Sequence, residues 1–166
     1  MPPLPSSIGR QSAERTEPVT KEFIKSQVAE LVAHFGTRDP EEIAAGLKVC
    51  VKRSDIGSLK GMYTVLLGKP FIVISDALDE VQSRQIAAHE LGHDRLHRHF
   101  AAESILQETM FYNMTSQPEA EANLFAAELL LGEGAQDLAK EGATLSEIAA
   151  AFGVEERLAE IYFENR

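Results

Sequence analysis

The segment AAHELGHDRLHRHF, residues 87–100, contains histidines and a glutamate at a spacing that can bind and use a metal ion. If the segment is helical, His89 and His93 lie one turn apart on the same face, about 6 Å apart along the axis. Two imidazoles placed in this way can share one ion, and in the H-E-x-x-H pattern that ion is zinc. The spacing therefore predicts a zinc site on this segment.

Glu90 gives the pattern its chemistry. It lies about 100° around the helix from His89, where it can contact a water on the metal rather than the metal itself. Zinc lowers the pKa of its water to roughly 7, and a carboxylate beside it can take the proton while the oxygen attacks an amide carbonyl. The same carboxylate can return the proton to the leaving amine. The alternative interpretation is an exposed polar helix face that matches H-E-x-x-H by chance.

A catalytic zinc site needs a third protein ligand, and the other histidines are poor candidates. His97 lies about 12 Å along the axis from His89, so one ion cannot bind both. His99 would match the third histidine of the longer metzincin pattern, but Leu96 stands where that pattern has the glycine that turns the chain back. His34 closes an amphipathic helix and is expected to face solvent.

The segment SQPEAEANLFAAELLL, residues 116–131, offers two glutamates as third ligand. Ser116 and Glu119 have the spacing of a capping box, which would occupy the Glu119 carboxylate at a helix N-terminus. Glu121 has no such role and shares a helix face with apolar neighbours, so we expect it to point inward to the metal, with Glu119 as the alternative. Glu128 could accept a hydrogen bond from a ligand histidine or form a salt bridge.

Helix signals precede the histidine segment. Apolar residues recur at helical spacing through residues 24–35, and Gly36 can end that helix. Asp39 as N-cap and Pro40 at the first helical position predict a short second helix, which should stop near Gly46.

Strand signals follow, and then a long helix. Residues 47–52, 62–67 and 71–75 are rich in β-branched, aromatic and other apolar residues, and the last two runs flank the turn signal Gly68-Lys69-Pro70. We therefore predict a small sheet with one hairpin. The proline-free stretch 79–97 predicts a helix of about five turns that carries the histidines. The predicted fold class is α+β, with the sheet packed on the metal helix.

Composition limits the classes of function. The chain has 166 residues, of which 44% are hydrophobic, and its 26 acidic against 16 basic residues give a formal net charge of −10, which repels phosphate. Cys50 is the only cysteine, which suits a reducing compartment. No apolar run approaches the ~18 residues of a membrane span. We expect a cytoplasmic protein with no membrane or direct nucleic-acid partner, a flexible tail over residues 1–20, and one domain over residues 21–166.

Residues 144–164, TLSEIAAAFGVEERLAEIYFE, resemble a helix-turn-helix in their apolar spacing, with Gly153 at the turn. A helix that reads DNA needs basic groups, but the charged residues of the second helix of this pair are mainly glutamates. The pattern therefore predicts a packed helical pair, which could dock a partner protein, rather than a DNA-binding unit.

Taken together, the two motif segments resemble the ImmA/IrrE family of small bacterial and phage metallopeptidases. The resemblance rests on AAHELGHDRLH at 87–97, on EAEANLFAAELLL at 119–131, and on the hairpin-then-helix order before them. It covers roughly residues 21–160, which is nearly the whole chain after the predicted tail.

This resemblance implies a zincin-like metallopeptidase core. It implies His89, His93 and Glu121 as zinc ligands and Glu90 as the catalytic glutamate. The family's activity also implies cleavage of a helix-turn-helix repressor, which would free stress-response or mobile-element genes.

We interpret the sequence as a cytoplasmic zinc endopeptidase that cleaves a helix-turn-helix (XRE-like) repressor. An extended substrate would pair with a strand edge beside the metal helix, at residues 62–67 or 71–75. Tyr63, Tyr112 or His99 could stabilise the oxyanion. The alternative, from another class, is a metal-binding anti-repressor or toxin–antitoxin component that regulates by binding without cleavage.

Overall fold

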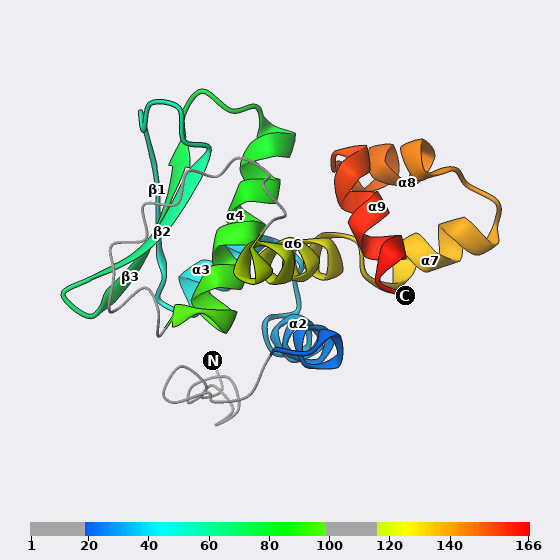
Figure 1. The fold of residues 1–166 in the computed structure, drawn as a ribbon, viewed down its shortest axis with the longest axis horizontal. Helices are drawn as coiled ribbons and strands as arrows, with labels where there is room; N and C mark the ends of the chain where they lie inside the picture. The colour runs from blue at the N-terminus through cyan, green and yellow to red at the C-terminus, as the bar shows by residue number, and fades with distance from the viewer. Residues whose placement is uncertain (1–18, 99–115) are drawn as a thin grey trace.

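The computed structural model describes residues 19–98 and 116–166 of the chain, and this part is a mixed α+β fold (Figure 1). The mixed α+β class predicted from the sequence is confirmed, while residues 1–18 of the predicted tail lie outside the described residues. The strands are β1 (Cys50–Ser54), β2 (Gly61–Leu66) and β3 (Lys69–Ser75). The helices are α2 (Lys21–Phe35), α3 (Pro40–Gly46), α4 (Glu80–Leu96), α6 (Gln117–Leu130), α7 (Gly132–Lys140), α8 (Leu145–Phe152) and α9 (Glu156–Glu164).

The described strands form one sheet in the order β1-β3-β2, in which β3 is parallel to β1 and antiparallel to β2. The predicted hairpin between β2 and β3 is confirmed, but its turn is one residue earlier than predicted. Leu67 and Gly68 form the turn with φ of 50° and 76°, as a tight two-residue connection of right-twisted strands requires. Lys69 and Pro70 therefore begin β3.

The first two described helices are bounded by the capping residues that the sequence predicts. Gly36 closes α2 in the left-handed region, with φ of 68°, and its N–H bonds to Val32. Asp39 caps α3 by accepting hydrogen bonds from the backbone N–H groups of Glu41 and Glu42, both at 2.9 Å.

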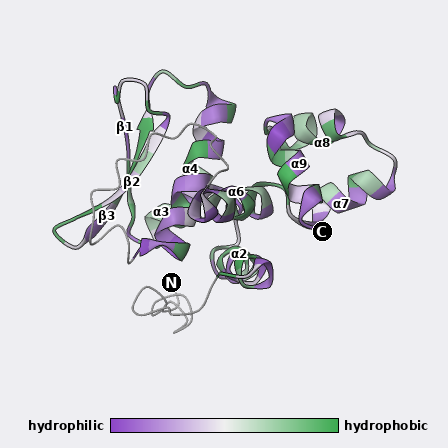
Figure 2. Cartoon of the chain, viewed as in Figure 1, coloured by the Kyte–Doolittle hydropathy of each residue, from purple (hydrophilic) through white to green (hydrophobic). Residues whose placement is uncertain are grey.

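Helix α6 is the centre of the molecule. It packs against α4, α2 and α9, and every residue from 122 to 130 is buried (Figure 1). The surrounding helices each carry both hydrophobic and hydrophilic residues, as Figure 2 shows, and the apolar sides join α6 in one core. Because α6 is enclosed along most of its length, polar side chains on it must find partners inside the protein.

Helices α4 and α6 approach closely at Gly92. A Cβ placed on Gly92 would lie 3.2 Å from the Cα of Ala122 and 3.2 Å from the Cβ of Phe125, so the neighbours in its way are parts of α6. Any side chain here would force α6 to shift by a few tenths of an ångström, so packing favours glycine at this position, although glycine lowers the helix propensity of α4 by about 1 kcal/mol relative to alanine.

Replacing Gly92 with alanine should lower the free energy of unfolding by about 1–2 kcal/mol, because overpacking against a backbone outweighs the gain in propensity. Urea unfolding measures this directly. Gly134→Ala on α7 is the matched control, since its new Cβ would meet only the ring of Phe152 at 3.1 Å. Equal stability of the two variants would contradict the close approach of α4 and α6.

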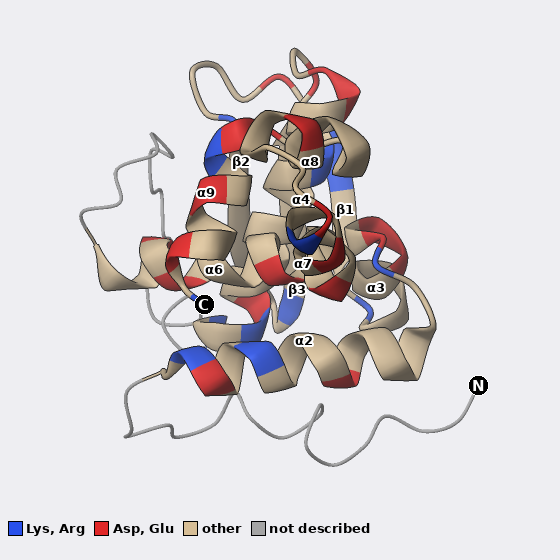
Figure 3. Cartoon of the chain, turned by 90° about the vertical axis from the view of Figure 1, so that its right-hand side faces the viewer, with Lys and Arg blue, Asp and Glu red and all other residues tan. Residues whose placement is uncertain are grey.

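The predicted helical pair at residues 144–164 is present as α8 and α9. Thr144 and Glu147 form a reciprocal capping box at the start of α8, and Gly153 ends that helix with φ of 61°. Figure 3 shows acidic residues across these helices. Arg157 lies 2.7 Å from Glu160 and 3.5 Å from Glu164, so its charge is shared with acids of the same helix.

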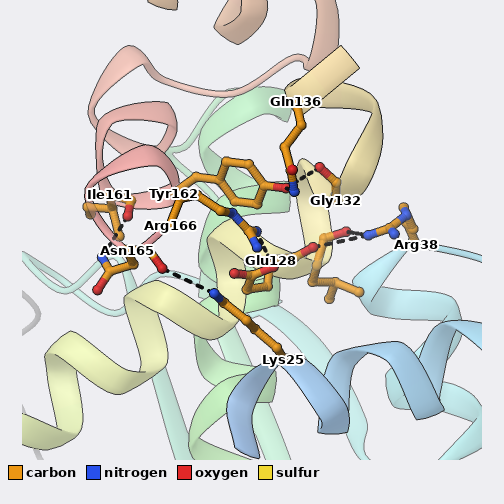
Figure 4. Close-up of polar contacts among 10 residues, drawn as sticks. Lys25, Arg38, Glu128, Gly132, Gln136, Ile161, Tyr162, Asn165 and Arg166 are labelled. Carbon is orange, nitrogen blue, oxygen red and sulfur yellow. Dashed lines mark hydrogen bonds and ion pairs between the residues drawn. The ribbon is translucent and has the colours of Figure 1, made fainter. Parts of the chain in front are cut away.

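The end of α9 is fixed to α6 and α2 by polar contacts (Figure 4). Arg166 lies 2.6 Å from Glu128 and covers the ring of Tyr162, and the Tyr162 hydroxyl donates to the carbonyl of Gly132. Lys25 of α2 donates to the carbonyl of Asn165 at 3.1 Å. Of the two roles considered for Glu128, the salt bridge is therefore the one observed. Among the residues that the structure describes, no helix combines the length and apolar character of a membrane span.

Candidate metal centre

The H-E-x-x-H segment lies on α4, with both histidines turned into the protein. His89 is 4% exposed and His93 is 9% exposed, and their Nε2 atoms lie 3.1 Å apart. Glu119, in the first turn of α6, meets them from the opposite side. Its Oε2 lies 3.2 Å from His89 Nε2, and its Oε1 lies 3.2 Å from His93 Nε2. Two helices thus bring three donor groups to one buried point.

The structure brings Glu119, and not Glu121, to the two histidines. Ser116 is the N-cap residue of α6 but makes no capping hydrogen bond through its side chain, so the predicted capping box is absent. The Glu119 carboxylate is therefore available to the histidines. Glu121 lies about 200° around the helix from Glu119, and its carboxylate contacts His97 and Gln117. The geometry thus favours Glu119, the alternative, over Glu121 as the third ligand.

These three groups fit a zinc ion. At ligand distances of about 2.0–2.1 Å, the donor atoms of a tetrahedral zinc site are roughly 3.3 Å from one another. The two Nε2 atoms are 3.1 Å apart, and each lies 3.2 Å from a different oxygen of Glu119. One donor atom from each of the three residues lies within 4.8 Å of the other two, which is close enough for small side-chain shifts to bring all three to one ion. Oε1 of Glu119 is buried and receives no hydrogen bond within the described part of the chain. Two imidazoles and one carboxylate, with one position open, are a donor set of catalytic zinc sites.

Asn123 orients His89. Its Oδ1 lies 2.8 Å from Nδ1 of His89, so the neutral ring keeps its proton on Nδ1, and this tautomer would leave the Nε2 lone pair for a metal ion. Asn123 was not among the residues predicted from the sequence. Its position four residues after Glu119, on the same face of α6, was the signal that could have found it once Glu119 was the ligand.

Burial and charge act against each other in this cluster. Burial alone lowers the pKa of His89, but the hydrogen bond to Glu119 and the charges of Glu90 and Glu119 outweigh it, so the pKa is raised. Burial lowers the pKa of His93 to about 4. Burial opposes ionisation of Glu119, yet the two histidines hold its pKa well below the usual range. At neutral pH the site therefore offers an ionised carboxylate and a neutral His93.

Glu90 points from α4 toward the sheet. It is 1% exposed, and a Cβ placed on Gly61 would lie only 2.7 Å from its Oε1. The missing side chain at Gly61, the first residue of β2, is therefore what admits the carboxylate at this place. Gly61 was not singled out in the sequence, because nothing local to it shows that α4 passes so close.

Tyr63 is unsuited to the role of oxyanion donor considered above. Its hydroxyl donates a 2.8 Å hydrogen bond to Oδ1 of Asp94, and both residues are buried. Burial and the Asp94 charge raise the pKa of Tyr63 above its usual range. The other two candidates, Tyr112 and His99, lie outside the described residues. The Tyr63–Asp94 bond instead ties β2 to α4 next to His93.

Tyr63→Phe should lower the free energy of unfolding by about 1–3 kcal/mol, because it leaves a buried carboxylate without one of its donors. Urea unfolding of the metal-free protein is the measurement. The matched comparison is the same change in an Asp94→Asn background, where a neutral amide replaces the carboxylate and the loss should be smaller. An equal loss in both backgrounds would assign the effect to packing of the ring.

Most of this chain is similar in sequence to known proteins. The family model for the IrrE N-terminal-like domain matches residues 44–162, a range that contains α4 and α6. The uncharacterized immunity region protein 2 of Bacillus phage phi105 is 31% identical over 141 residues, which cover 84% of this chain and 88% of the relative. Metallopeptidase ImmA of Bacillus subtilis strain 168 is 28% identical over 140 residues, which cover 81% of this chain and 80% of the relative.

Proposed function

The chain belongs to the IrrE N-terminal-like domain family, as its motifs indicated, and on that premise we propose that it is a zinc-dependent endopeptidase with a zincin-like active site. In this proposal His89, His93 and Glu119 hold the zinc ion and Glu90 is the catalytic base. One observation supports it most: the Nε2 atoms of two histidines lie 3.1 Å apart, and each lies 3.2 Å from one oxygen of the same buried carboxylate. Glu119 replaces Glu121 as the proposed third ligand.

The roles of the protein groups follow from their positions. Zinc in this site would lower the pKa of a water molecule to roughly 7 and polarise the scissile carbonyl. Glu90 accepts the proton of the attacking water and delivers it to the amide nitrogen as the C–N bond breaks, so the products are a carboxyl and an amino terminus. Its burial beside Gly61 holds the carboxylate in one place, which proton transfer requires.

The substrate would bind as an extended strand along β2. Within the described part of the chain β3 is the central strand and β2 lies at an edge, and β2 packs on α4 beside the histidines. Of the two strands considered from the sequence, β2 therefore suits the role. Leu66 and Leu67 at its end are 54% and 103% exposed and can contact apolar side chains of a substrate.

We propose a helix-turn-helix (XRE-like) repressor in the cytoplasm as the substrate, whose loss would free stress-response or mobile-element genes. Two relatives support this proposal, because one is named for a phage immunity region and the other is named as a metallopeptidase. The net charge of −10 and the glutamates of α8 and α9 disfavour contact with a nucleic acid. The protein would therefore act on the repressor rather than on its operator.

The proposed function is tested by mixing the zinc-loaded protein with the helix-turn-helix regulator encoded beside its gene and measuring intact masses. We expect two fragments whose masses sum to that of the regulator plus one water, and none when a chelator is present. A stable complex without fragments would contradict the proposal. It would support the alternative, an anti-repressor or toxin–antitoxin component that acts by binding.

A further inference from the structure

His97 and Glu121 form a buried chain of contacts that leads away from the metal site. His97 is 3% exposed and follows His93 by one helical turn, and its Nδ1 lies 3.0 Å from Nδ1 of His93. Its Nε2 lies 2.8 Å from Oε2 of Glu121. The other carboxylate oxygen of Glu121 accepts a 2.8 Å hydrogen bond from Nε2 of Gln117.

Each proton in this series of contacts can be assigned to one nitrogen atom, starting from His93. For His93 Nε2 to give its lone pair to a metal ion, the proton of the neutral ring must be on Nδ1, and that proton needs an acceptor. Nδ1 of His97 stands at hydrogen-bond distance, and it accepts only if the proton of His97 is on Nε2. A carboxylate only accepts, so Glu121 at 2.8 Å keeps the proton on that nitrogen.

The two histidines of the site are therefore oriented in different ways by residues of α6. His89 donates directly to Asn123 of α6. Glu121, two residues earlier on α6, reaches His93 only through a second imidazole. This explains why a carboxylate that does not touch the two histidines of the site is nevertheless turned inward, with 12% of its side chain exposed.

We propose that Glu121 and His97 are a positioning pair, which holds His93 in the tautomer that leaves its Nε2 free for the metal. The proposal rests on the proposed function, because it assumes that His93 binds zinc. It gives a role to the glutamate that the sequence suggested as a ligand and to the histidine that lies too far from His89 to be one.

Glu121→Gln is the sharpest variant, because it changes the shape of the side chain very little. If Gln117 keeps its bond to Oε1, the new amide presents its N–H₂ group to His97, which forces the proton of His97 onto Nδ1 and that of His93 onto Nε2. We expect the zinc affinity to fall about 10–100-fold, the usual effect of losing such an outer partner. Glu133→Gln removes the same charge at an exposed position of α7 and should leave the affinity unchanged.

Variants of His97 separate positioning from a general structural role. Glutamine at this position can donate to Glu121 and accept from His93, so His97→Gln should retain most of the zinc affinity. His97→Phe keeps a ring but can do neither, and should lose affinity as Glu121→Gln does. In the His97→Phe background, Glu121→Gln should have no further effect on the zinc affinity, because the hydrogen bonds that link Glu121 to His93 are already lost.

The experiment is a chelator-competition measurement of zinc affinity on the full chain of each variant, with circular dichroism of the metal-free forms as a check on folding. The pattern described above supports the pair. An undiminished effect of Glu121→Gln in the His97→Phe background, or none in the wild-type background, would overturn it. So would a loss in Glu121→Gln as large as in Glu119→Gln, since that would make Glu121 a ligand. A wild-type protein that binds no zinc would refute the metal site itself.

Discussion

Replacing Glu90 with glutamine should lower the rate of peptide hydrolysis by about 10²–10⁴-fold while one zinc ion per chain remains bound. The amide keeps the shape of the side chain but cannot accept the proton of the attacking water. Because Glu90 is buried and is not among the three converging groups, its neutralisation should leave the ligands in place. The measurement is single-turnover cleavage of the partner regulator, with zinc content determined on the same samples.

The matched control for this change is Glu80→Gln. Glu80 is exposed in the first turn of the same helix, so its replacement removes one negative charge without touching the site. We expect wild-type cleavage from it. Full activity of Glu90→Gln would contradict the assignment of Glu90, and loss of zinc from that variant would show that Glu90 is a ligand or supports one.

Glu119→Gln should weaken zinc binding by roughly 10³-fold. Zinc binding in protein sites is worth about 10–16 kcal/mol in total, so one of three ligands accounts for several kcal/mol, at about 1.4 kcal/mol for each tenfold. Glu121→Gln should cost less, because Glu121 contacts His97 rather than either ligand histidine. Chelator competition on the two isosteric variants ranks the two carboxylates directly.

The ranking of these two variants decides which glutamate is the ligand. A larger loss in Glu121→Gln would contradict the geometry and would restore the residue that the sequence favoured. Unfolding of the metal-free Glu119→Gln protein provides the control. The carboxylate holds two buried imidazoles 3.2 Å away, so part of its effect could be on the stability of the fold.

Signals confined to neighbouring residues predicted most of the described elements, although α7 was not predicted and β1 begins three residues later than the predicted strand. The end of α2 at Gly36, the cap of α3 at Asp39, the hairpin between β2 and β3 and the helix that carries His89 and His93 all follow from caps, turns and periodicity. Each of these choices depends on chemistry within a few residues. The parallel pairing of β1 with β3 was not predicted, because it joins strands that are not consecutive in the chain.

The choice between Glu119 and Glu121 could not be made locally. The spacing of Ser116 and Glu119 satisfies a capping box, and only the approach of α4 shows that two imidazoles compete for the same carboxylate. The role of Gly61 was hidden for the same reason, since Glu90 reaches it from another element. Site residues that depend on contacts between α4, α6 and β2 need the fold to be identified.

The central claim is that His89, His93 and Glu119 share one metal ion, and anomalous diffraction at the zinc edge from crystals of the zinc-loaded protein tests it most directly. We expect one strong peak per chain, bounded by the Nε2 atoms of the two histidines and the carboxylate of Glu119, while the Glu121 carboxylate stays hydrogen-bonded to His97. A peak bound by Glu121, or zinc found only at other positions, would contradict it.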